Sequence, residues 1–172
     1  MAADNPLWTY SAEVYAKPGV EAACLRLQDR FGVDVNVLFY CCLAAHRYGV
    51  ALNGAAIKDV LRCVDRWNAD VVRPLRALRR TLKGATFEGI DPDEKERFRD
   101  EIKRVELLAE KQQQAALCAL IELPKLQPGD SDGRRRMALR NLRAYLDTLG
   151  AATDAQAQED VRLIAAALFD RE

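Results

Sequence analysis

Helix start and stop signals recur along the whole chain, and they constrain the fold more than any other feature. Residues that cap helices, two of them followed by proline, precede apolar side chains at 3–4 spacing. Glycines follow several of these patterns, and strict two-residue alternation is absent. The main start signals are Asn5-Pro6, Asp34, Asn53 and Asp91-Pro92. With only 9 Gly and 6 Pro, the chain also has few residues for the tight turns of a small β-sandwich.

These signals predict an all-α fold, and 172 residues suit a single-domain bundle of about seven helices. The predicted helices cover residues 6–16, 18–31, 35–48, 53–84, 92–123, 134–149 and 154–170. Pro74 should kink or divide the fourth helix, because proline cannot donate a hydrogen bond to Asp70. A possible subdivision separates an N-terminal helical core, 1–84, from the long helix and two C-terminal helices, 91–172. Thr153 and Gln156 are expected to form a capping box for the last helix.

The third predicted helix is apolar on nearly all sides from Val37 to Ala45, which is typical of a helix surrounded by others. We therefore expect it at the centre of the core. Four cysteines lie in apolar helical contexts and are interpreted as reduced core thiols: Cys24, Cys41, Cys42 and Cys63.

The predicted helix 92–123 is longer than a compact bundle of this size needs, so it could protrude, as a hairpin with the helix after it. Its apolar positions step by four and three, as in a coiled coil. This predicted seam consists of Phe98, Ile102, Val105, Ala109, Gln112, Ala116, Ala119 and Leu123. The seam is expected to be the buried face, but the polar Gln112 leaves room for pairing with another protein or a second copy.

The charges cancel in sum, with 26 basic and 26 acidic residues, but not by segment. Residues 62–83 and 134–143 each carry a net +5, whereas 91–110 and the last twenty residues each carry −3. An anion or partner surface could therefore include Arg73, Arg76, Arg80, Arg134, Arg135 and Arg136. Net neutrality and the absence of interleaved aromatic residues argue against nucleic-acid binding, and pairing with the acidic helices is the preferred interpretation.

Polar and aromatic residues of the first three predicted helices form a candidate small-molecule pocket. Its members are Trp8, Glu13, Tyr15, Arg30, Asp34, Asn36 and His46. Asp34 and Asn36 bracket a helix N-terminus, so helix capping is the alternative interpretation of that pair.

No reaction centre is recognisable. The single histidine, His46, shares a helix face with Cys42, but too few further ligand residues accompany them for a metal site. His46 is instead interpreted as a residue at the end of a core helix, where a positive charge would favour the helix dipole. There is no phosphate-binding loop and no nucleophile motif, so we predict no metal, no cofactor and no catalytic residue.

The N-terminal third has a series of residues at fixed gaps, from Leu7 to Tyr48. They read Leu7-Trp8-x-Tyr10-Ser11, Val14-Tyr15, Pro18-Gly19-Val20, Ala23-Cys24-Leu25-x-Leu27-Gln28-Asp29 and Gly32-x-Asp34-Val35-Asn36-x-Leu38. This series resembles an uncharacterised bacterial family of small all-helical proteins of unknown function. The resemblance implies no activity and no catalytic residues.

The sequence thus predicts a cytoplasmic protein, because no secretory signal is recognisable and the longest apolar run, Val37 to Ala45, cannot span a bilayer. The preferred function is non-enzymatic protein–protein interaction or regulation. The alternatives are a small-molecule binder or enzyme with a pocket near Trp8, Tyr15, Asp34 and His46, and more weakly a nucleic-acid binder that uses the arginine-rich helices.

Overall fold

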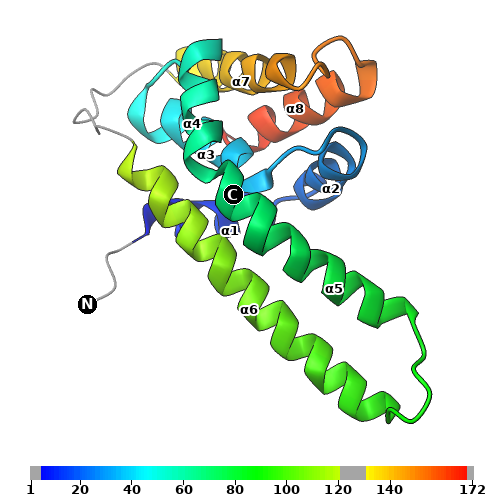
Figure 1. Ribbon diagram of the computed structural model, residues 1–172. Helices are drawn as coiled ribbons and strands as arrows, with labels where there is room; N and C mark the ends of the chain where they lie inside the picture. Colours follow the sequence, from blue (N-terminus) through cyan, green and yellow to red (C-terminus); the bar gives the residue numbers. More distant parts are fainter. Residues whose placement is uncertain (1–4, 121–130, 170–172) are drawn as a thin grey trace.

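The protein is an all-α bundle in a computed structural model, which describes residues 5–120 and 131–169 and contains no strand in those ranges (Figure 1). The elements are α1 (Pro6–Tyr15), α2 (Val20–Phe31), α3 (Val35–Tyr48), α4 (Gly54–Trp67), the π-helical segment η1 (Asn68–Val72), α5 (Arg73–Gly84), α6 (Pro92–Ala119), α7 (Ser131–Thr148) and α8 (Ala155–Ala167). Because α4, η1 and α5 follow one another without a break, the described residues form seven helical stretches, as predicted.

Helix α3 lies at the centre, as its apolar composition predicts. Every residue from Asn36 to Ala45 is buried. The Asp34 side chain accepts hydrogen bonds from the backbone N–H groups of Asn36 and Val37, which confirms its capping role, and Gly49 ends the helix in the left-handed conformation. Helix α7 packs against α3, and the side chain of its buried Asn141 bonds Leu52 N, Cys41 O and Val50 O at 2.8–3.2 Å. This buried amide therefore has partners on both its donor and acceptor sides.

The division that Pro74 predicts takes the form of a π-helical segment. Pro74 lies in the first turn of α5, and Asn68–Val72 immediately before it has π-helical geometry. Proline lacks the N–H that an α-helical hydrogen bond to Asp70 would need, and the wider π turn accommodates this change. The chain therefore continues from α4 into α5 instead of turning back.

Helices α5 and α6 run side by side away from the other helices and are joined at their far end (Figure 1). We call residues 73–119 the hairpin and the remaining described residues the body. The Asp91 carboxylate caps α6 by accepting from the N–H groups of Asp93 and Glu94 at 2.9 and 3.0 Å. With 28 residues, α6 is about 42 Å long, and its C-terminal half packs on α1, α3 and α4.

The long helix protrudes as predicted, but it pairs with the helix before it and not with the one after it. The reason is electrostatic, since α5 carries the arginines that bind the carboxylates of α6. No helix in the described ranges is long and apolar enough to cross a membrane.

The predicted seam of α6 is wrong over most of its length. Phe98, Val105, Gln112, Ala116 and Ala119 are exposed, and among the seam residues that the structure describes only Ala109 is fully buried. The buried positions are Glu106, Ala109, Gln113, Gln114 and Leu117. Glu106, Gln113 and Gln114 face inward because their polar partners lie on α3 and α5. The buried side of α6 is therefore not the side that its apolar pattern indicates. Leu123 lies outside the described residues.

Two smaller predictions are also corrected. Asp154, not Thr153, caps α8, because its carboxylate accepts from Ala157 N at 2.8 Å. Cys63 is exposed, whereas Cys24, Cys41 and Cys42 are buried as predicted. Burial raises the pKa of the Cys41 thiol to about 12, as expected for an unreactive core thiol.

Candidate functional site

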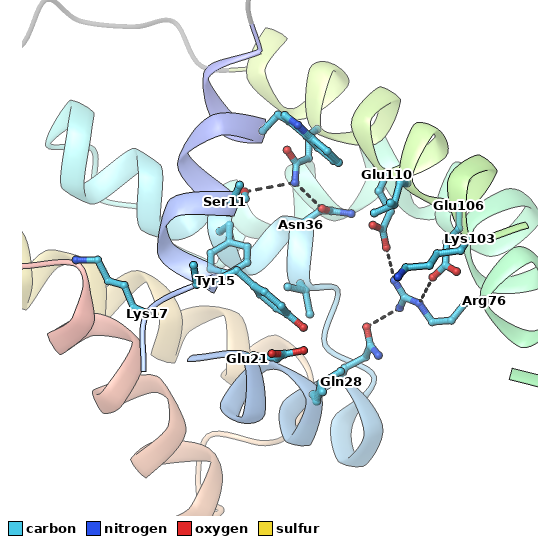
Figure 2. Close-up of a pocket in the computed structure, with 18 of the residues that line it drawn as sticks. Ser11, Tyr15, Lys17, Glu21, Gln28, Asn36, Arg76, Lys103, Glu106 and Glu110 are labelled. Atoms are coloured by element: carbon cyan, nitrogen blue, oxygen red, sulfur yellow. Dashed lines mark hydrogen bonds and ion pairs between the residues drawn. The ribbon is translucent and has the colours of Figure 1, made fainter. Parts of the chain in front are cut away.

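A groove of about 880 Å³ lies where the hairpin leaves the body. Figure 2 shows labelled side chains around it that come from α1, α2, α3, α5 and α6. Its apolar wall includes Trp8, Tyr15 and Phe39, and its polar wall includes residues of α5 and α6. A volume of this size falls within the range of small-molecule sites.

A chain of side-chain hydrogen bonds runs behind the groove, from Ser11 to Asp34. The Gln114 amide N–H donates to Ser11 Oγ at 3.3 Å and to Asn36 Oδ1 at 2.7 Å. Asn36 Nδ2 donates in turn to Gln113 Oε1 at 3.1 Å, and Gln113 Nε2 donates to Asp34 Oδ2. We call Ser11, Gln114, Asn36, Gln113 and Asp34 the amide chain; it ties α1, α3 and α6 together.

An ionic cluster forms the floor of the groove on the hairpin side. Arg76 binds Glu106 at 3.0 Å and Glu110 at 2.5 Å, and Arg79 binds Glu106 at 2.5 Å. Arg76 Nη1 also donates to Gln28 Oε1 at 2.5 Å, which connects α5 to α2. Burial favours a higher pKa for Glu106, but the hydrogen bonds and charges of the two arginines outweigh it and hold the pKa below its usual value. Burial raises the pKa of Glu110 instead.

The aromatic side chains of the wall carry no charge of their own. The Tyr15 ring meets Phe39 edge to face, with centroids 6.2 Å apart, and Lys111 lies 5.6 Å from the centre of the Trp8 ring. Burial, together with the nearby Glu21, raises the pKa of Tyr15 to about 12. The Tyr15 hydroxyl therefore keeps its proton at neutral pH and can donate a hydrogen bond.

Three of the residues predicted for a pocket do meet in this groove: Trp8, Tyr15 and Asn36. Asp34 does not line it. Its carboxylate lies at the far end of the amide chain, where it also accepts from Asn68 Nδ2 and faces a second hollow. The sequence pattern placed Asp34 correctly at the start of α3 but could not show toward which side its carboxylate points.

The other predicted pocket residues lie elsewhere, so the expected single set is corrected. Glu13 pairs at the surface with Arg47 at 3.8 Å, and Arg30 pairs with Asp154 at 3.0 Å. His46 packs between Tyr10, whose hydroxyl is 3.1 Å from Nδ1, and the ring of Phe169. Glu13, Arg30 and His46 therefore lie on sides of their helices that do not face the groove.

His46 is also not the positively charged helix terminus that its position predicts. Burial, followed by the charges of Arg47, Arg134 and Lys17, lowers the pKa of His46 to about 4. The imidazole is therefore neutral at pH 7. Among the described residues, no group of three or more His, Cys, Asp or Glu side chains is placed to hold a metal ion.

The predicted pairing of the arginines with acidic neighbours is present on α5. Arg76 binds α6, and Arg80 binds Asp29 of α2 at 3.0 Å. Arg73, which shares that helix, borders the second hollow. On α7, Arg134 Nη1 donates to the carbonyl of His46 at 3.3 Å, while Arg135 and Arg136 are exposed.

Four groove residues were not predicted, Ser11, Glu106, Glu110 and Gln114, and neither was Gln113 of the amide chain behind the groove. The run of three glutamines at 112–114 was the available signal, since uncharged amides inside a helix that packs at a core need partners. The apolar pattern placed Gln112 on the buried side, whereas α6 is rotated so that Gln113 and Gln114 face inward and Gln112 is exposed.

The hairpin carries most of the exposed apolar side chains. Within the described residues, ten large hydrophobic side chains are exposed, and seven of them lie on the hairpin. These seven are Leu78, Phe87, Ile90, Phe98, Val105, Leu107 and Leu108. Leu107 lines the groove, whereas Phe98, Val105 and Leu108 lie on other faces of α6.

Comparison with known proteins finds one family, described as "Protein of unknown function (DUF2390)", which matches residues 6–117. No curated protein and no solved structure matches the chain. The matched residues include the whole of the groove and of its amide chain, and nearly all of the hairpin.

Proposed function

The chain belongs to this family of proteins of unknown function, and we propose that it binds another protein through the outer face of its hairpin. The outer face is the side of α6 that carries Phe98, Val105 and Leu108. The observation that carries the proposal is the concentration of exposed apolar side chains there. Phe98 and Leu108 are 53% and 50% exposed. Apolar surface concentrated on one projecting element is typical of an interaction site.

The outer face has the spacing of a helix-packing surface. Phe98, Val105 and Leu108 are separated by seven and three residues, so they lie on one side of α6. The buried residues Glu106 and Gln113 lie further round the helix, and Ala109, one turn after Val105, lies at the border between the two sides. The partner surface that fits such a row is an apolar helix face, since side chains at this spacing interlock with those of another helix.

Charged residues border this apolar row. Glu94 pairs with Arg97 at 2.5 Å and Glu101 with Arg104 at 2.8 Å, and all four side chains are well exposed. Exposed pairs one turn apart contribute little to stability. They would, however, supply the polar rim that surrounds the apolar centre of a protein interface.

The arginines favour this function over nucleic-acid binding. Arg76, Arg79 and Arg80 already bind carboxylates of the same chain. Phosphate contacts there would have to displace these pairs.

A photo-crosslinking amino acid at Val105 tests the proposal in the cells that make the protein. We expect a discrete cross-linked product from this position and none from the exposed Lys58 on α4, which serves as control. Changing Phe98→Ser together with Leu108→Ser should abolish the product. If Val105 cross-links to nothing, or if the double variant cross-links as well as the wild type, the proposal is wrong.

A further inference from the structure

Three side chains that line the groove have hydrogen-bond donors without an acceptor in the described part of the chain. The donors are Lys103 Nζ, Arg79 Nη1 and the Tyr15 hydroxyl. Arg79 bonds Glu106 only through Nε and Nη2. None of the three donor atoms is among the buried side-chain atoms that lack a partner in that part of the chain. Solvent can therefore reach them, and so can a ligand.

The Tyr15 hydroxyl lies between the two sides of the groove. Figure 2 shows it beside Glu21 of α2 and pointing toward the side that carries Arg76. The charges of Glu21, Glu110 and Arg76 all act on this hydroxyl, so it lies near both α2 and the ionic cluster. Lys103 and Arg76 lie together on the hairpin side in the same view. The unpaired donors thus border one space.

The charge of the groove favours an anion. Five basic and three acidic side chains line it. Asp29 pairs with Arg80 from outside the groove at 3.0 Å, so one positive charge remains uncompensated. Lys103 has no ion pair among the described residues and is exposed. A carboxylate carries one negative charge and only accepts hydrogen bonds, so it matches both the charge and the unpaired donors.

The apolar surface of the groove favours an aromatic ring on the same ligand. Trp8, Tyr15 and Phe39 line the body side, and aromatic rings bind other rings through stacked and edge-to-face contacts. Leu25 of α2 and Leu107 of α6 also line the groove and are 40% and 43% exposed. A ring in the groove would cover part of this surface.

We propose that the groove binds a small molecule that carries an aromatic ring and a carboxylate. The ring packs against Trp8 and Tyr15. The carboxylate accepts from Lys103 and from Arg79 Nη1, so the bonds of Arg79 to Glu106 stay in place. This site is separate from the outer hairpin face, whose residues do not line the groove.

Indole-3-acetate and indole-3-acetamide test the proposal as a matched pair of probes, since they share the ring and nearly the same size but differ in charge. We expect indole-3-acetate to shift the amide resonances of Tyr15, Gln28 and Lys103 in NMR spectra of the full chain at pH 7. Indole-3-acetamide should bind at least about tenfold more weakly, because charged hydrogen bonds contribute more than neutral ones.

Two variants separate the local cation from the general charge of the protein. Lys103→Met removes the unpaired cation from an exposed position, so the fold should be kept, and it should weaken indole-3-acetate binding about fivefold. The affinity for indole-3-acetamide should not change. Lys83→Met is the control, because Lys83 is exposed on α5 and does not line the groove. This variant loses the same unit of charge and should bind both probes as the wild type does.

Four results would overturn the proposal. The first is an absence of resonance shifts at millimolar indole-3-acetate, and the second is equal affinity for the two probes. The third is wild-type affinity for indole-3-acetate in Lys103→Met. The fourth is a set of shifts that maps outside the groove. None of these results depends on whether the outer hairpin face binds a protein, so the two proposals can fail separately.

Discussion

In the body, apolar side chains surround α3 on nearly all sides, whereas in the hairpin α5 meets α6 through arginines and a buried glutamate. Helix α5 buries only Leu82, and α6 buries Glu106 where it faces Arg76 and Arg79. The large apolar side chains of the hairpin remain mostly at the surface. Ion pairs thus join the two hairpin helices and leave their apolar residues available for contacts with another molecule.

The largest effect is expected from a cavity in the body. Leu146 is 1% exposed in the core between α3 and α7, so Leu146→Ala should lower the free energy of unfolding by about 2–5 kcal/mol. Leu108→Ala on the hairpin is the matched control, and it should change that energy by no more than about 0.5 kcal/mol. Urea denaturation of both variants measures the difference. Equal losses would contradict the contrast.

The next effect is expected in the hairpin. Glu106→Gln removes the carboxylate that Arg76 and Arg79 share. Arg76 keeps its pair with Glu110, so the loss should be that of the charged hydrogen bonds to Glu106, about 2 kcal/mol. Glu101→Gln breaks an exposed pair with Arg104 and should cost less than about 1 kcal/mol. Because the folded pKa of Glu106 is lowered, its contribution is present above the unfolded pKa of about 4.3 and is lost as the pH falls through the folded pKa. Urea midpoints from pH 7 to pH 3 should fall less steeply for Glu106→Gln than for the wild type. Parallel curves would show that the pair does not stabilise the protein.

A smaller, pH-dependent effect is expected in the body at His46. The folded pKa of about 4 lies below the unfolded value of about 6.5. Between these values the unfolded chain binds more protons, so stability should fall as the pH is lowered from 7 to 5. His46→Gln should remove this part of the dependence. An unchanged pH profile in that variant would mean that His46 is solvated in the folded protein.

The smallest effects should be the same in both regions, since helix caps act locally. Asn53→Ala in the body removes an acceptor for Ala56 N, and Asp91→Ala in the hairpin removes one for Asp93 and Glu94. Each should cost about 1 kcal/mol by thermal unfolding. A several-fold difference between the two would show that one helix start depends on tertiary contacts.

The sequence predictions succeed where neighbouring residues determine the structure, and they fail where residues far apart in the chain determine it. Caps at Asp34 and Asp91 and the central place of α3 were predictable because neighbouring residues determine them. The pairing of α5 with α6 was not, because Glu106 is buried only through arginines about thirty residues away in the chain. Likewise the sequence placed Trp8, Tyr15 and Asn36 in a common pocket. The position of the Gln114 side chain was not predictable, because it depends on hydrogen bonds that link α1, α3 and α6.

The free energy of unfolding of the double variant Phe98→Ser and Leu108→Ser tests most directly whether the outer hairpin face serves a partner and not the fold. Both side chains are at least half exposed, so their replacement should change that energy by no more than about 1 kcal/mol in total. A loss of about 3 kcal/mol or more, comparable to a core cavity, would show that these residues stabilise the chain itself and would contradict the account.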